Sequence, residues 1–351
     1  MSDLDQDFIL PDGTGLADIK GALEARCRIA DDARRPICRR FHDTFDWLVY
    51  EAGGALEERR EGQGRQLLWH DLRADSPALV QALDVDPGFA SALTPGPVTE
   101  RLRRVVGIRR LLGLTEVVSG VQTLRLLNED EKTVVRLEVE ENRFQDGARE
   151  RQGPLSSRLR VRVVRGYLQE YRQALAMLEA ELGLTPARAP LALEACAAAG
   201  RKPGDYSSRL DFRLDPDGRA DATAKEILLH LLDTLEANVP GTRENLDSEF
   251  LHDLRVAVRR TRSALTQIKG VFPPELVEEY KERFAWVGQV TGPVRDLDVY
   301  LIDFPGYQES LPEPLRPHLE PLRVFLLAHY DETQSKVAAE LASRRFRGLL
   351  K

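Results

Sequence analysis

The sequence predicts an α+β protein in which an antiparallel β tunnel or barrel with flanking helices is followed by an all-α helical bundle. Up to about residue 165, short apolar runs are separated by turn signals such as Gly53-Gly54. After Ala220 the apolar residues instead recur with the period of a helix. We therefore expect a β domain at residues 1–185, a linker at residues 186–218 and a helical domain at residues 219–351.

The strands expected in the first domain alternate charged and apolar residues, which predicts a sheet with one polar face. We place strands at residues 7–10, 38–43, 55–60, 66–72, 98–111, 123–128, 133–144 and 159–164. Helices are expected beside them at residues 16–25, 76–83 and 163–183. In a tunnel, the polar face of such a sheet lines the lumen.

The linker is rich in proline, alanine, glycine and arginine, a composition typical of a connection between domains. Beyond it, glycine and proline residues divide the chain into a series of helices. We expect them at residues 222–237, 251–269, 274–290, 294–304 and 314–345.

The composition argues against several classes of function. The net charge is -7, so any binding of anions has to come from a local cluster, and we expect no nucleic-acid partner. The three cysteines, Cys27, Cys38 and Cys196, lack the spacing of metal ligands and are expected to be reduced thiols. The chain shows neither the pattern of a signal peptide nor an apolar run of ~18 residues, so we expect a cytoplasmic protein without membrane contact.

The expected helix at residues 251–269 carries basic residues along one side, which we call the basic stripe. At about 100° per residue, its members fall within about 80° of one another. They are His252, Arg255, Arg259 and Arg262. A solvated basic face is the alternative interpretation, but such faces usually mix charges, and Asp253 is the only acid between His252 and Lys269. Because guanidinium groups match phosphate oxygens, the stripe predicts a polyanion ligand.

Two motifs in this domain, HDLRVAVRRTRSAL at residues 252–265 and GPVRDLDVYL at residues 292–301, resemble the signature of the CHAD family. The resemblance implies helical bundles around a basic cavity that binds inorganic polyphosphate, and an association with polyphosphate granules. The resemblance maps His252, Arg255, Arg259 and Arg262 onto the family's histidine and basic positions, and we expect these four residues and Arg295 to bind polyphosphate. We add Arg260, Arg344 and Arg345 as further candidates. No second His/Arg helix follows, so we expect only the first half of the family's domain.

The second motif also contains Asp296 and Asp298, for which two interpretations stay open. They could form ion pairs that orient Arg255 or Arg295, or they could bind a metal ion directly.

The first domain resembles the CYTH family in two segments, RFHDTFDWLVYEAGGAL at residues 40–56 and RLEVEENRFQDG at residues 136–147. The resemblance implies an antiparallel tunnel that binds or hydrolyses triphosphates. It also implies that Glu138 and Glu140 match an acidic pair that holds Mg²⁺ or Mn²⁺. We expect the same lumen to be lined by Arg101, Arg103, Arg109, Arg125 and Arg136.

The same domain departs from the CYTH pattern at several positions. The family's ExExK signature has only Asp5-Gln-Asp7-Phe-Ile9 as a counterpart, with Ile9 in place of the lysine. Glu57 and Glu58 stand where basic residues are expected, and His70 replaces a lysine. Because phosphoryl transfer needs fixed bases to spread the charge of the transferred group, these changes favour an inactive tunnel.

Three functions follow as hypotheses. We favour an inorganic polyphosphate-binding protein that needs no cofactor for binding. The alternative is a metal-dependent triphosphatase that acts in the tunnel with Mg²⁺ or Mn²⁺. A structural adaptor is the third, in which the stripe meets an acidic partner or is neutralised internally by residues such as Glu249 and Asp296.

Overall fold

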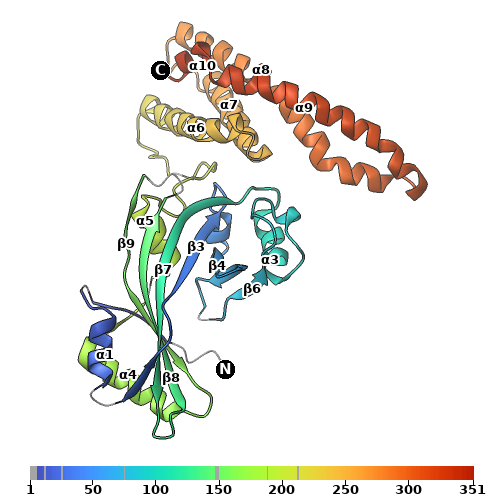
Figure 1. The fold of residues 1–351 in the computed structure, drawn as a ribbon. Helices are drawn as coiled ribbons and strands as arrows, with labels where there is room; N and C mark the ends of the chain where they lie inside the picture. The colour runs from blue at the N-terminus through green and yellow to red at the C-terminus, as the bar shows by residue number, and fades with distance from the viewer. Residues whose placement is uncertain are drawn as a thin grey trace. The chain divides into compact units, whose positions relative to one another are not determined.

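The computed structural model describes residues 6–11, 13–24, 27–74, 76–146, 150–187, 189–211 and 213–351. The chain forms two compact units, Met1–Asp205 and Tyr206–Lys351, and the division falls within the segment predicted as a linker. Each unit has its own hydrophobic core, so each can be described by itself (Figure 1). Asp5, part of the candidate ExExK counterpart, lies outside the described residues.

One antiparallel sheet forms the first unit, in the order β11-β1-β10-β8-β7-β3-β4-β5-β6, with β2 paired to β7 and β9 to β8. The strands are β1 (Gln6–Ile9), β2 (Arg28–Asp31), β3 (Arg35–Asp43), β4 (Gly54–Glu61), β5 (Gly64–Asp71), β6 (Leu79–Ala82), β7 (Leu112–Leu127), β8 (Thr133–Gln145), β9 (Gln152–Pro154), β10 (Arg158–Val163) and β11 (Thr185–Pro186). Among the described residues no pairing joins β11 to β6, so the sheet is an open tunnel rather than a closed barrel. Its two ends face a common cavity of about 730 Å³, lined by Phe8 and Pro186 on one side and Leu68 and Val80 on the other.

Alternation along the long central strands separates a buried face from a polar face. On β8, Leu137 and Val139 belong to the core, whereas Glu138 and Glu140 point to the opposite side. The core lies between the sheet and two helices, α1 (Leu16–Glu24) and α4 (Leu168–Leu182), which cover one end of it (Figure 1). The polar side chains are therefore gathered on the concave face of the tunnel.

The concave face is partly filled by a short helix, α5 (Leu191–Ala198). Its small residues Ala192 and Ala195 pack against Phe41 of β3 and Val117 of β7. A separate core at the other end of the sheet joins β4 and β5 to α2 (Leu48–Glu51), η1 (Ala90–Ala92) and α3 (Pro97–Val106).

Two elements of this unit contradict the sequence prediction. Residues 98–111 were predicted as a strand, but α3 occupies most of them, because Pro97 starts a helix whose buried residues recur every four positions at Val98, Leu102 and Val106. Residues 76–83 were predicted as a helix, but they contain strand β6, whose backbone pairs with the edge of β5.

The second unit contains helices only. They are α6 (Ala220–Arg243), α7 (Ser248–Gln267), α8 (Pro274–Ser310), the 3-10 helix η2 (Glu313–Leu319), α9 (Glu320–Leu341) and α10 (Arg344–Leu349). Leu254 and Val258 of α7 pack with Leu235 of α6, Phe284 of α8 and Val337 of α9. Asp247 caps α7, since its carboxylate accepts hydrogen bonds from the backbone N–H groups of Glu249 and Phe250.

Helix α8 is continuous, although a break was predicted at Gly292-Pro293. A proline inside a helix removes one backbone hydrogen bond, but Val287 and Val294 on either side are both buried in the core, and their packing keeps the helix continuous. The far half of α8 then runs through η2 into α9 as a long helical hairpin (Figure 1). In the part of the chain that the structure describes, no helix combines the length and apolar character of a membrane span.

Candidate functional site

The basic stripe lies on α7, at the border between its buried and exposed sides. His252 and Arg255 are half-buried, whereas Arg259 and Arg262 are exposed. The buried side of the same helix is formed by Leu254, Ala257, Val258, Thr261 and Leu265. The guanidinium groups of Arg255 and Arg262 extend toward Gly292 and Gly288 of α8, so the stripe faces the line where the two helices meet.

Arg255 is held in place without a carboxylate. Its Nη1 donates to the carbonyl oxygen of Gly288 and to the hydroxyl of Thr291, both at 2.9 Å. Burial lowers the pKa of this guanidinium; the charge of Asp296 opposes that shift, while Arg295 and Arg259 add to it. Arg255 therefore keeps a positive charge that the protein only partly compensates, which is what an anion-binding site requires.

Arg295 lies at the other end of this cluster. Its Nη1 is buried and makes no hydrogen bond among the described residues, and its nearest carboxylate is that of Glu249, at 3.9 Å. Asp298 is buried next to it, and burial raises the pKa of this carboxyl to about 6 despite the hydrogen bond with Tyr330 and the charge of Arg295. Asp296 is exposed and acts on Arg255 only through its charge, without an ion pair between the two side chains.

The three further candidates lie in different environments. Arg260 donates to the carbonyl oxygen of Ser208, at 3.0 Å, and thus points away from the stripe. Arg344 is exposed in the first turn of α10. The guanidinium of Arg345 lies 4.2 Å from the ring centroid of Trp286, in a cation–π contact.

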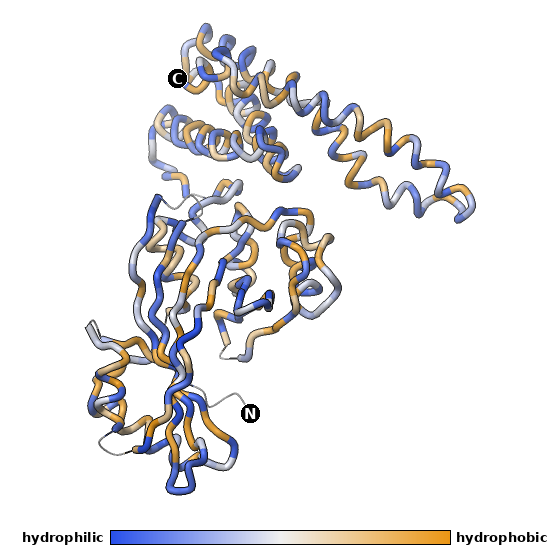
Figure 2. Tube along the Cα trace, in the orientation of Figure 1, coloured by the Kyte–Doolittle hydropathy of each residue, from blue (hydrophilic) through white to orange (hydrophobic). Residues whose placement is uncertain are grey.

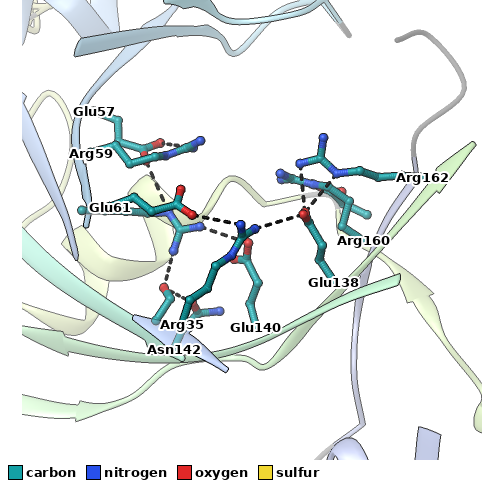
Figure 3. Close-up of polar contacts among 12 residues, drawn as sticks. Arg35, Glu57, Arg59, Glu61, Glu138, Glu140, Asn142, Arg160 and Arg162 are labelled. Atoms are coloured by element: carbon teal, nitrogen blue, oxygen red, sulfur yellow. Dashed lines mark hydrogen bonds and ion pairs between the residues drawn. The ribbon is translucent and has the colours of Figure 1, made fainter. Parts of the chain in front are cut away.

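The concave face of the tunnel carries a second cluster of charged residues, drawn in Figure 3. At its centre is Arg39 of β3, of which only 4% is exposed. Arg39 forms ion pairs with Glu57 of β4 at 3.3 Å and Glu140 of β8 at 3.0 Å, and it also donates to the hydroxyl of Ser119. That hydroxyl donates in turn to the side-chain oxygen of Asn142, at 2.6 Å.

Glu57, one of the departures from the CYTH pattern, is an integral part of this cluster. Burial alone would raise the pKa of its carboxyl, but the hydrogen bond from His70 and the charges of Arg59 and Arg39 hold the pKa well below its usual range. The distances are 2.7 Å from the carboxylate to His70 and 2.7 Å to Arg59. Glu57 is therefore a permanent internal counter-anion for two arginines.

The predicted metal ligands are engaged in the same way. Glu138 pairs with Arg35 at 3.2 Å and Arg162 at 2.9 Å (Figure 3). Glu140 pairs with Arg39. Mg²⁺ and Mn²⁺ require several oxygen ligands in regular geometry, and among the described residues no three acidic, histidine or cysteine side chains are grouped to hold a metal ion. In this arrangement the carboxylates of Glu138 and Glu140 are paired with arginines, which a divalent cation would have to displace.

The remaining bases of the concave face are also paired. Arg160 makes a two-pronged ion pair with Asp7, at 2.6 and 2.8 Å. These hydrogen bonds raise the pKa of the Arg160 guanidinium. Arg158 pairs with Glu194 of α5 at 2.8 Å, which fixes this helix on the concave face.

The concave cluster was only partly predicted from the sequence. None of the five arginines proposed to line the lumen borders either cavity of the tunnel. Arg101 and Arg103 belong to α3, Arg109 pairs with Asp46, Arg125 pairs with Asp32, and Arg136 is exposed. The arginines that do line a cavity on the concave face include Arg39, Arg158 and Arg160. A signal was present for Arg160, which stands between Leu159 and Val161 in a predicted strand, whereas Arg39 is followed by another arginine and Arg158 precedes the predicted strand.

The second unit is thus a helical domain with a row of basic residues at a helix–helix junction. Residues 226–351 match the family model of the CHAD domain, so this unit carries a CHAD domain. No curated protein matches the chain.

Several solved structures show a distant likeness to the chain. One, described as a candidate adenylate cyclase from Bacillus halodurans, is 10% identical, covers 53% of this chain and 91% of its own, with a TM-score of 0.36. A candidate adenylyl cyclase from Hippeastrum, described as having a dominant triphosphatase activity, is 14% identical, covers 58% and 99%, with a TM-score of 0.35. A third, a candidate adenylate cyclase from Vibrio parahaemolyticus, is 9% identical, covers 52% and 88%, with a TM-score of 0.30. None of these likenesses assigns an activity to this chain.

Proposed function

We propose that the protein binds inorganic polyphosphate through the basic stripe of its CHAD domain, with His252, Arg255, Arg259, Arg262 and Arg295 as the contacting residues. One observation carries the proposal. Among the described residues, Arg255, Arg259 and Arg262 form no ion pair with a carboxylate, whereas Arg39, Arg59, Arg158 and Arg160 of the tunnel all do.

The spacing of the stripe suits a chain of phosphates. With a rise of about 1.5 Å per residue, Arg255 and Arg259 are about 6 Å apart along the axis of α7, and Arg259 and Arg262 about 4.5 Å. Each guanidinium can donate two parallel hydrogen bonds to one phosphate group. Binding needs no covalent step and no metal ion, because the charge of the arginines replaces that of a cation.

The arginines of the tunnel are less suited to bind a polyanion than those of the stripe. Its arginines are already neutralised by Glu57, Glu140, Asp7 and Glu194, so a triphosphate would have to displace buried ion pairs. The alternative function, a metal-dependent triphosphatase, has one observation in its favour, the cavity of about 730 Å³ that Arg59, Arg160 and Arg162 border. We infer that this cavity does not turn over triphosphates.

The proposal is tested by measuring the affinity for long-chain polyphosphate of a variant with Arg255, Arg259 and Arg262 all changed to alanine. We expect the dissociation constant to rise by at least about 100-fold, since each lost charge-assisted contact is worth roughly 1–3 kcal/mol. A matched control removes the same charge from exposed positions of the same unit, Arg316, Arg323 and Arg347. The proposal is wrong if both variants lose affinity equally, or if neither does, while circular dichroism shows both to be folded.

A further inference from the structure

The helical hairpin of α8 and α9 exposes apolar side chains on all sides. Between 38% and 57% of each of the following residues is exposed: Val299, Tyr300, Ile302, Tyr307, Leu315, Leu322, Val324, Phe325 and Leu327. From residue 299 to residue 327 only Phe304 and Leu326 are buried. Figure 2 shows hydrophobic residues along both helices of the hairpin. Two helices alone cannot bury apolar residues that surround them, so such a hairpin is normally covered by a further layer.

One side of the hairpin carries most of the large rings. Tyr300 and Tyr307 are two helical turns apart on α8, and Leu322 and Phe325 are one turn apart on α9. On a helical projection, Tyr300 and Tyr307 lie about 40–60° around the axis of α8 from the buried Phe304. Leu322 and Phe325 lie about 40–100° around the axis of α9 from the buried Leu326, in the same sense. Because the two helices run antiparallel, rotations of the same sense place both pairs on the same side. We call these four residues the aromatic face.

We propose that the aromatic face is the interface of a homodimer, in which the hairpins of two copies pack together into a four-helix bundle. The four side chains expose roughly 400 Å² per copy, about half of the ~800 Å² that each partner contributes to a stable interface, close to the usual apolar share. Tyrosine and phenylalanine are also the residues enriched at the centres of interfaces.

The charges of the hairpin argue against an anionic surface as its partner. Residues 299–327 contain four acids, Asp303, Glu309, Glu313 and Glu320, against two arginines, Arg316 and Arg323. A lipid bilayer with acidic headgroups or a nucleic acid would be repelled by this excess. A second copy is the partner whose face is of the same size and apolar character, and a twofold axis makes such a contact self-complementary.

The test is the mass of the full-length protein in solution, measured by sedimentation velocity without polyphosphate. We expect the wild-type chain to be a dimer in the micromolar range and the double variant Tyr300→Glu/Phe325→Glu to be a monomer. Leu229→Glu is the matched control, because Leu229 is 60% exposed on α6, outside the hairpin, and this variant is expected to remain a dimer.

The milder variants Tyr307→Ser and Phe325→Ser guard against misfolding of the double variant. Each should raise the dissociation constant of the dimer at least tenfold with an unchanged circular dichroism spectrum. A wild-type chain that stays monomeric overturns the proposal, and the aromatic face would then have to contact a different protein. A dimer with the same dissociation constant in all variants also overturns it, because the contact would then lie elsewhere.

Discussion

Two buried or half-buried arginines show how the same residue type acquires opposite roles. Arg39 is surrounded by Glu57 and Glu140, so its charge is cancelled inside the tunnel. Arg255 donates hydrogen bonds only to a carbonyl oxygen and a hydroxyl, so no carboxylate in contact with it cancels its charge. Both side chains are fixed by hydrogen bonds, but only Arg255 keeps a positive charge that an external anion could neutralise.

The role of Arg39 can be tested by its removal. Arg39→Ala leaves two buried carboxylates without their shared partner, and we expect the free energy of unfolding of the first unit to fall by about 3–5 kcal/mol. Chemical unfolding followed by the fluorescence of Trp47 and Trp69, both in the cores of this unit, measures the loss. The control is Arg60→Ala, because the exposed Arg60 shares Glu58 with His42 and Arg65, and its loss should cost less than about 1 kcal/mol.

Asp298 predicts a pH dependence of the helical unit. Its pKa is raised from the ordinary 3.8 to about 6, so between these values the folded state holds a proton that the unfolded state has released. By linkage, this carboxyl makes the unit less stable as pH rises from about 4 to 6, and its full cost remains above pH 6. Asp298→Asn should therefore stabilise the unit at pH 7.5, by roughly 1–3 kcal/mol, and change little at pH 4.

Hydrogen exchange of the α7 and α9 amides at the two pH values measures this difference within the helical unit. The control is Asp296→Asn, which should change the protection of these amides little at either pH, since Asp296 is exposed. A stabilisation by Asp298→Asn that is the same at both pH values would contradict the assignment to ionisation.

The stripe was predictable residue by residue, whereas the concave cluster was not. Spacing within one helix decides which residues of α7 share a side, so His252, Arg255, Arg259 and Arg262 could be grouped from the sequence. The cluster around Arg39 joins β3, β4 and β8, and only the pairing of the strands determines which side chains meet. For this reason, the prediction of which arginines line the lumen was wrong.

At the scale of single elements, local sequence signals predicted the helices and strands correctly where those signals agreed with tertiary packing. Helix α7 lies where the period of its apolar residues placed it, and β3, β4, β5, β8 and β10 lie where alternation placed them. Helix α3 was misassigned because Val98, Leu102 and Val106 lie among alternating arginines that resemble a strand. Helix α8 continues through Pro293 because burial on both sides of the proline outweighs its local preference.

Helix α7 as an element predicts how polyphosphate binding depends on salt. If three guanidinium groups each displace counterions from the phosphate chain, the logarithm of the binding constant should fall steeply with the logarithm of the salt concentration. The Arg255/Arg259/Arg262 triple alanine variant should lower that slope by about 2–3, by analogy with single-stranded nucleic acid. Titrations at several salt concentrations measure it, and a slope that the variant leaves unchanged would mean that the contacts lie elsewhere on the unit.

At the scale of the whole molecule, the two units divide the charge of the chain differently. The net charge of -7 gives no general attraction to anions. Within the first unit, acids and arginines neutralise each other on the concave face, while within the second the stripe is left without carboxylate partners among the described residues. Anion binding is thus expected of one unit, and a stable internal salt-bridge network of the other.

This division predicts that changes in the two units have separable effects on two assays. Arg59→Ala, in the tunnel, should leave the affinity for long-chain polyphosphate unchanged, because Arg59 is engaged by Glu57. Chelation of divalent metal with EDTA should leave it unchanged as well, since the arginines of the stripe supply the positive charge. Phosphate released from tripolyphosphate, assayed in the same samples, should not rise when Mg²⁺ or Mn²⁺ is added. Metal-dependent release that disappears in Glu138→Gln would instead show that the arginine partners of Glu138 yield to a cation, and that the first unit is an enzyme.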